Sequence, residues 1–426
     1  MGRFWTRKVL SAFISGHDFL WTSAMPFVAR VPFAKTSRPP VEITYRAIPC
    51  PGKQARFAGR EMLVPEIDLA QWTCRAVVDW LDVEVTFGRR TQPQHVQKVL
   101  CESFREDRVT HVAPLNSGPD RTSETFVIRY QEPNRRRFSK AMTALEKKFG
   151  ILGERTTAIE VSVDFKPEQP SDEARAQMFG VLQRALWIEP SVFDEPEARP
   201  RTSTARGKPP GFMLAKIEGR SDGKAEWLSG ERDAPVPADS TLYVGRRDGD
   251  VLLRLMDKVI DRQDPGKGMF DPLKDEDKRV RIEVTLRGSA LDRIGLQVPD
   301  DLGRVKFSQL QSEVFKMVLP TFPGARDLEE SVANSARTKR AHDRFLAAGV
   351  LALQAMEIGR RAFREQQAED VQRFVKLRGL PVKKRDRRGT GETSHFVSYA
   401  ALNSRLRKAL ENLERSWAIV TTAPRT

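Results

Sequence analysis

Four side chains on neighbouring stretches of this chain could act together on a phosphodiester. They are Tyr243, Arg254, Arg281 and Glu283. A tyrosine hydroxyl can serve as a nucleophile, arginines can bind phosphate oxygens, and a carboxylate can hold a divalent cation. The sequence around them predicts β-strands, so their proximity depends on how those strands pair.

The tyrosine and the first arginine belong to a predicted β-hairpin in residues 241–258. Asp248-Gly249 favours a tight two-residue turn with positive φ angles, and aliphatic runs flank it. In this register Tyr243 lies opposite Arg254, and Thr241 lies opposite Met256. Cross-strand partners share a face of the sheet, so all four side chains are expected on one face.

The glutamate lies on a further predicted strand, Arg279–Leu286. Val280 and the alternate residues after it form an apolar face, which leaves Arg281, Glu283 and Thr285 on the other face. Glu283 is therefore the first candidate metal ligand. The alternative is a surface carboxylate that pairs with Arg281 or Arg254.

Asp164 is the second candidate ligand. It lies on a predicted strand, Thr157–Phe165, whose outward side chains include Glu160 and Asp164. These two carboxylates are four residues apart, or ~13 Å along a strand, so they cannot both bind one ion directly. The alternative for Asp164 is a solvated strand face.

Three segments resemble the signature of the replication initiation factor family, the rolling-circle Rep proteins of plasmids and phages and related relaxases. The segments are Thr-Leu-Tyr-Val-Gly-Arg-Arg (241–247), Leu-Leu-Arg-Leu-Met-Asp-Lys (252–258) and Arg-Ile-Glu-Val-Thr-Leu (281–286). The resemblance implies a plasmid or mobile-element protein that binds origin DNA and nicks one strand through a 5′-phosphotyrosyl intermediate. It implies Mg²⁺ or Mn²⁺ as the cofactor, and it leaves open a host helicase and a homodimer as partners.

In this chain the family tyrosine falls on Met256, whose thioether cannot attack a phosphodiester. Tyr243 then becomes the candidate catalytic residue, because it lies diagonally across from Met256 at the ~7–8 Å typical of such neighbours. The alternative is a structural Tyr243. If no tyrosine reacts, the protein is an inactive relative that binds DNA as a regulator or accessory protein.

The net charge of +15 indicates a polyanionic partner, most simply nucleic acid. Arg254, Lys258 and Arg281 are expected at the phosphate, and Arg246 and Arg247 at the edge of the hairpin. A further basic run, Lys383–Arg388, is typical of a flexible linker. An RNA-binding protein is a third reading, but the predicted outward side chains are mainly Asp, Glu, Ser, Thr and Arg rather than aromatic.

The order of predicted elements from residue 81 to 165 is β-α-β-β-α-β, which favours an α+β, ferredoxin-like antiparallel sheet. Similar strand–helix openings at 81–104 and 159–187 suggest a duplication. We therefore expect a poorly structured segment at 1–70, a DNA-binding and nicking region at 71–300, and a helical, basic region at 301–426.

Three widely spaced cysteines give neither a zinc motif nor a disulfide framework, which fits the cytoplasm. No phosphate-binding glycine loop or nucleophile-elbow motif is present in the sequence, so nucleotide enzymes and classical hydrolases find no support.

Overall fold

The computed structural model describes residues 27–52, 54–103, 111–118, 120–203, 211–212, 233, 235–264, 269–324, 332–378 and 396–418. Within them the chain builds a nine-stranded sheet, a five-stranded sheet and a two-stranded hairpin. None of the helices in this part of the chain has a stretch long and apolar enough to cross a lipid bilayer. The basic run Lys383–Arg388 lies outside the described residues.

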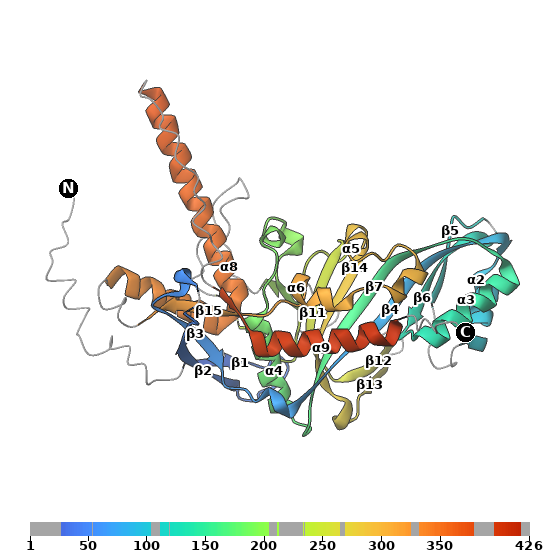
Figure 1. Ribbon diagram of the computed structural model, residues 1–426, viewed down its shortest axis with the longest axis horizontal. Helices are drawn as coiled ribbons and strands as arrows, with labels where there is room; N and C mark the ends of the chain where they lie inside the picture. Colours follow the sequence, from blue (N-terminus) through green and yellow to red (C-terminus); the bar gives the residue numbers. More distant parts are fainter. Residues whose placement is uncertain are drawn as a thin grey trace, which may run out of the picture.

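The nine-stranded sheet is antiparallel throughout, in the order β5–β6–β4–β7–β14–β11–β10–β8–β9 (Figure 1). Its two longest strands, β4 and β7, lie side by side near its middle. The strands are β4 (Trp72–Thr91), β5 (His111–Leu115), β6 (Ser123–Gln131), β7 (Ile151–Pro167), β8 (Arg201–Ser203), β9 (Gly211–Phe212), β10 (Thr241–Val244), β11 (Val251–Lys258) and β14 (Arg279–Arg287).

The first half of this sheet confirms the ferredoxin-like prediction. The chain runs β4, α2 (Pro93–Ser103), β5, β6, α3 (Arg135–Phe149), β7, and the strands lie in the order β5–β6–β4–β7. The second half does not repeat that order. Because β4 already occupies one edge of β7, strand β14 inserts between β7 and β11, and the sheet continues as β7–β14–β11–β10.

The two faces of the sheet differ in chemistry. Val161, Val163 and their neighbours on adjacent strands are buried against helices α3, α4 (Asp172–Ala185) and α9 (Ala400–Trp417), which pack on this apolar face. The alternate residues of β7, among them Glu160 and Asp164, point to the opposite face with polar residues of β14 and β11. We refer to this opposite side as the polar face.

The predicted hairpin register is confirmed, but the predicted turn is wrong. Tyr243 pairs with Arg254 and Thr241 with Met256, as expected. The strands, however, are joined by six residues, 245–250, and the positive φ angle (96°) belongs to Gly245 rather than to Asp248 or Gly249. A Cβ on Gly245 would lie 2.3 Å from the carbonyl oxygen of Val251, so only glycine fits there.

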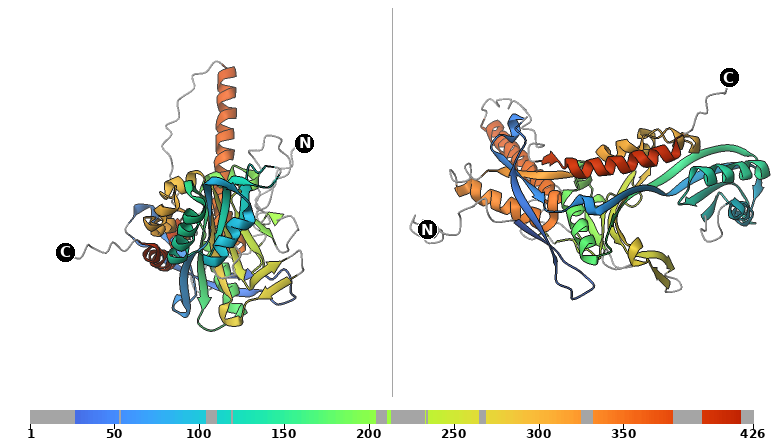
Figure 2. Two further views of the ribbon diagram at one scale, coloured as in Figure 1. Left: turned by 90° about the vertical axis from the view of Figure 1, so that its right-hand side faces the viewer. Right: turned by 60° about the horizontal axis from the view of Figure 1, so that its bottom comes forward.

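Residues 27–65 correct the expectation of a poorly structured N-terminal segment. They form β1 (Phe27–Val31), β2 (Val41–Pro49) and β3 (Arg60–Pro65), which join β15 (Val318–Pro323) and β16 (Phe396–Ser398) in the second sheet. Tyr45 of β2 is buried and packs edge-on against Phe345. Partners distant in sequence therefore order this segment. Figure 2 shows the second sheet near one end of the long sheet and α2 and α3 at the other end.

The C-terminal region is helical but less so than expected. Residues 305–318 form 3₁₀ turns, the short helix α6 (Leu310–Glu313) and the start of β15. Helix α8 (Val332–Leu377) bends at Gly349, and its second half projects from the body (Figure 1). The remaining elements are β12 (Ile260–Asp264), β13 (Met269–Pro272) and α5 (Ser289–Arg293).

Candidate active site on the polar face of the sheet

Strand pairing brings three of the four residues singled out above into one row across the polar face. Tyr243 on β10 lies opposite Arg254 on β11, and Arg254 lies opposite Glu283 on β14. Arg281, two residues before Glu283, lies in the next row between Met256 and Asp164. The strand pairing thus brings these four side chains to one face of the sheet.

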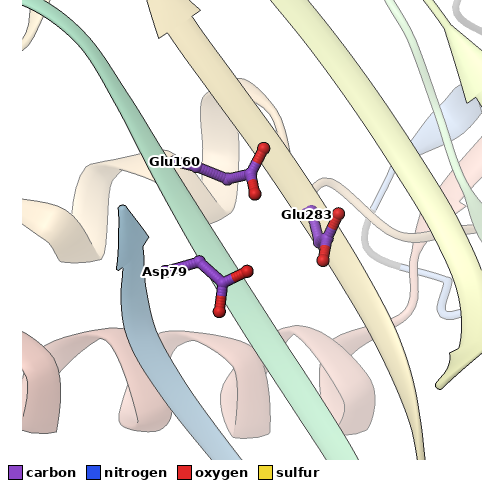
Figure 3. Close-up of side chains that lie close together, drawn as sticks. All are labelled: Asp79, Glu160 and Glu283. Carbon is purple, nitrogen blue, oxygen red and sulfur yellow. The ribbon is translucent and has the colours of Figure 1, made fainter. Parts of the chain in front are cut away.

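Glu283 belongs to a cluster of three carboxylates with Asp79 and Glu160. One oxygen of each group lies within 4.8 Å of the corresponding oxygens of the others. The three side chains come from β4, β7 and β14 and point toward one another (Figure 3). We refer to Asp79, Glu160 and Glu283 as the carboxylate cluster.

A β-bulge directs Asp79 into this cluster. On β4, Val78 pairs with Val161 and Trp80 pairs with Glu160, so Asp79 has no partner on β7. A bulge of this kind redirects a side chain that strict alternation would send elsewhere. Asp79 was not among the residues predicted from the sequence, although the pattern of β4 carries a signal. The apolar positions of β4 change phase from Cys74, Ala76 and Val78 to Leu81, Val83, Val85 and Phe87.

Two arginines contact the carboxylate cluster and offset part of its negative charge. Arg254 Nη2 contacts Glu160 Oε2 and lies 2.8 Å from Glu283 Oε2. Arg281 Nη1 donates to Asp79 Oδ1 at 2.7 Å, while its other nitrogens donate to both carboxylate oxygens of Asp164. The Arg281 side chain is 3% exposed, so its charge is committed to these acids.

Asp164 is an ion-pair partner in this structure. Besides its two hydrogen bonds from Arg281, it lies 3.0 Å from Arg279. The group that gathers around Glu283 contains Glu160 and Asp79 in place of Asp164. Glu160 and Asp164 flank Ser162, which pairs with Glu283, but Asp164 is held by its hydrogen bonds from Arg281.

Glu283 has an unusual electrostatic environment. Burial raises the pKa of its carboxyl group to about 7; Arg254 and Arg281 oppose this shift, while Glu160 and Asp79 add to it. Despite the short ion-pair distance, no N–H of Arg254 points at Oε2, and this oxygen has no hydrogen-bond donor among the described residues. The hydroxyl of the neighbouring Ser162 is likewise buried without a hydrogen-bond partner in that part of the chain.

These features fit a hard divalent cation. Three carboxylate oxygens in close approach are the ligands that Mg²⁺ and Mn²⁺ prefer. The buried Glu283 Oε2 lies 2.8 Å from Arg254 Nη2 but accepts no hydrogen bond from the described residues, so it has capacity left for an ion. The cation would compete with Arg254 and Arg281 for these carboxylates.

Tyr243 differs from the other three tyrosines of the chain. Tyr45, Tyr130 and Tyr399 are buried, and burial raises their pKa, that of Tyr399 to about 12. Tyr243 is only partly buried, and its strand position is directly opposite a cation, Arg254. Of the four hydroxyl groups, that of Tyr243 is the one placed to meet a substrate at the polar face.

The remaining expected DNA contacts lie at the edges of this region. Lys258 is at the end of β11 opposite Arg279, and burial lowers the pKa of its ammonium group. Arg246 and Arg247 are exposed in the loop after β10, where Arg246 donates to both oxygens of Asp248. Within the described part of the chain, Arg246 pairs with Asp248, Glu195 and Glu197, and no carboxylate pairs with Arg247.

A basic groove adjoins the carboxylate cluster. It encloses about 820 Å³ and follows residues 73–79 of β4, which precede the pairing of this strand with β6. The N-terminal turn of α3 and the last turns of α9 form its other walls. Its cationic side chains are Arg75, Arg135, Arg137, Lys166, Arg279 and Arg281, and its acidic side chains are Asp79, Glu132, Asp164 and Asp277.

No family model matches this sequence, and no curated protein matches it. Among solved structures, the chain is similar to a rolling circle replication initiator protein from Geobacillus stearothermophilus. The TM-score is 0.23 at 14% identity, over 52% of this chain and 77% of that chain. It is also similar to a 3-hydroxy-3-methylglutaryl-coenzyme A reductase of Streptococcus pneumoniae, with a TM-score of 0.16 at 10% identity, over 83% of this chain and 88% of that chain. At TM-scores this low, neither similarity says what the chain does.

Proposed function

We propose that this chain is a plasmid or mobile-element replication-initiation protein that binds origin DNA and cuts one strand at the polar face. The proposal depends above all on one observation: the carboxylate cluster lies in the same sheet face as the one tyrosine that is not buried. The family resemblance of the hairpin and of β14 supports a DNA partner. The net charge of +15 and the cations of the basic groove support it independently.

The residues of the polar face have distinct roles in this proposal. The Tyr243 oxygen forms a bond to phosphorus while the P–O3′ bond breaks, and the phenolic proton passes through solvent to the departing 3′ oxygen. Arg254, opposite Tyr243, would bind the negative phosphate oxygens. A divalent cation held by Asp79, Glu160 and Glu283 would polarise the scissile phosphate.

The test is nicking of supercoiled plasmid that carries the protein's own genetic locus, with Mg²⁺ or Mn²⁺. Wild type should yield open circles with protein bound to the 5′ end, and Tyr243→Phe should lose at least about a thousandfold in rate. Tyr399→Phe is the matched control, since that tyrosine is buried. Nicking that persists in Tyr243→Phe would contradict the role of Tyr243.

A second candidate function is DNA binding without cutting. It is favoured by Met256 at the position of the family tyrosine and by the two arginines that already pair with the carboxylate cluster. Under this alternative, wild type binds DNA in a salt-dependent manner and leaves supercoiled plasmid intact with either cation.

A further inference from the structure

Trp80 and Arg129 form a stacked pair beside the carboxylate cluster. The guanidinium carbon of Arg129 lies 3.9 Å from the centroid of the indole ring. Trp80 lies directly opposite Glu160 across the β4–β7 pairing, which places the ring on the polar face. The expected polar face contained no aromatic residue next to the carboxylates, because the predicted strand began only at residue 81.

Asp82 fixes the position of the guanidinium group. It pairs with Arg129 across β4 and β6, and its two oxygens accept hydrogen bonds of 2.8 and 2.7 Å from Arg129. The Asp82 side chain is only 12% exposed, whereas that of Arg129 is 37% exposed. A guanidinium held in this way by two bonds has little rotational freedom left to lose when a ligand stacks on it.

The electrostatic surroundings connect this pair to the site. The Asp82 hydrogen bonds are the main cause of a raised Arg129 pKa, and the charges of Glu160 and Arg254 also act on it. Residue 79, immediately before Trp80, belongs to both the carboxylate cluster and the basic groove. A single DNA strand whose phosphates follow the groove to the carboxylate cluster therefore reaches Trp80 and Arg129 next.

We propose that Trp80 and Arg129 are a stacking site for a base of single-stranded DNA, adjacent to the phosphate held at the carboxylate cluster. Indole rings and guanidinium planes are the surfaces on which proteins stack unpaired bases, and such stacking is tolerant of sequence. The charge of Arg129 suits a polyanionic strand. This site deepens the proposed function and depends on it.

The test measures binding of a fluorescein-labelled oligodeoxythymidylate to the full chain by anisotropy at low salt. Trp80→Ala should weaken binding by about five- to a hundredfold, and Trp80→Phe, which keeps a ring, by no more than about threefold. Trp187→Ala is the matched control. Lys316 covers that indole at 3.8 Å in a similar stacked pair, but Trp187 follows α4, away from the polar face.

A second probe separates stacking from a merely structural role. An oligonucleotide with abasic positions should lose affinity for wild type by a similar factor, and Trp80→Ala should bind both oligonucleotides alike. In wild type the stacked base should quench tryptophan emission, and Trp80→Phe should lose that part of the quenching.

Two results would overturn the stacking site: a folded Trp80→Ala with wild-type affinity, or wild type that does not distinguish the abasic oligonucleotide. Failure of wild type to bind the unmodified oligonucleotide would contradict the proposed function itself. That outcome is recognisable without any variant.

Discussion

Glu283 is the residue on which both ion binding and pH dependence centre. It is almost fully buried, faces two other carboxylates and has an oxygen without a hydrogen-bond donor among the described residues. Burial is costly for a charged carboxylate, and the two arginines offset that cost only in part. Glu283 is therefore the residue whose protonation a bound cation would change most.

Stability should depend on pH through Glu283. Its pKa is about 7 in the folded chain against 4.5 for an ordinary glutamate, so the folded state binds more protons between these values. Stability therefore falls as pH rises from 4.5 to 7. Between pH 5 and pH 8, the decrease in Tm should therefore be about 2–4 °C smaller in Glu283→Gln than in wild type.

Thermal melts of both proteins in EDTA measure this difference. Asp82→Asn serves as the matched control, because Asp82 is paired with Arg129 outside the carboxylate cluster. Parallel pH profiles for wild type and Glu283→Gln would show that Glu283 is not the titrating group.

Among the site residues, the sequence predicts the positions of those that lie on strands with regular alternation. Tyr243, Arg254 and Glu283 share a row because β10, β11 and β14 alternate without interruption in this region. Regular alternation did not predict Asp79 at the site, because a bulge breaks the alternation of β4. The pairing of Asp164 with Arg281 depends on a long-range strand order that local pattern does not encode.

The hairpin of β10 and β11 shows how an element can keep its register while changing its turn. An asymmetric loop of six residues and a two-residue turn give the same pairing of Tyr243 with Arg254. The loop is held at its start by the hydrogen bond from Gly245 N to Ala198 O, a contact from a distant segment. Turn chemistry read from Asp248-Gly249 alone could not anticipate that anchor.

Gly245→Ala should therefore destabilise the fold by about 2–4 kcal/mol, since alanine fits neither the positive φ angle nor the space beside Val251 O. Gly249→Ala should cost less than about 1 kcal/mol, because its φ angle is not positive. Urea denaturation compares the two. Equal costs, or a larger cost at Gly249, would support the two-residue turn instead.

Helix α8 gives a second example at the scale of elements. It bends at Gly349, whose φ angle is positive. There Arg184 of α4 donates to the carbonyls of Leu346 and Ala347, and Gln183 donates to that of Ala348. The bend leaves these carbonyls without helical partners, so two buried side chains from another helix determine its place.

In the whole molecule, segments far apart in the sequence complete both sheets and the groove. The second sheet joins residues 27–65 to β15 and β16, and the basic groove joins β4 to α3 and α9. The class of fold and the first four strands of the long sheet follow from periodicity. The N-terminal strands do not, because their sheet is completed by β15 and β16 from far along the sequence.

The overall charge makes a prediction at this scale. Arg75→Ala and Arg137→Ala, in the basic groove, should each reduce the slope of log K against log salt for single-stranded DNA by about 0.7. Arg46 is an exposed arginine on β2 that pairs with Glu66, away from the groove, so Arg46→Ala should leave the slope unchanged. Titrations of labelled DNA at several salt concentrations provide the slopes. Identical slopes for all four proteins would exclude the groove as the path of the phosphates.

The most direct test of the central claim is a Mn²⁺ titration of the full chain, followed by electron paramagnetic resonance. The carboxylate cluster predicts one bound Mn²⁺ per chain, lost in Glu283→Gln and in Asp79→Asn but retained in Asp82→Asn. Absence of stoichiometric binding by wild type, or binding that survives both cluster substitutions, would contradict the assignment of this face as a metal-assisted phosphodiester site.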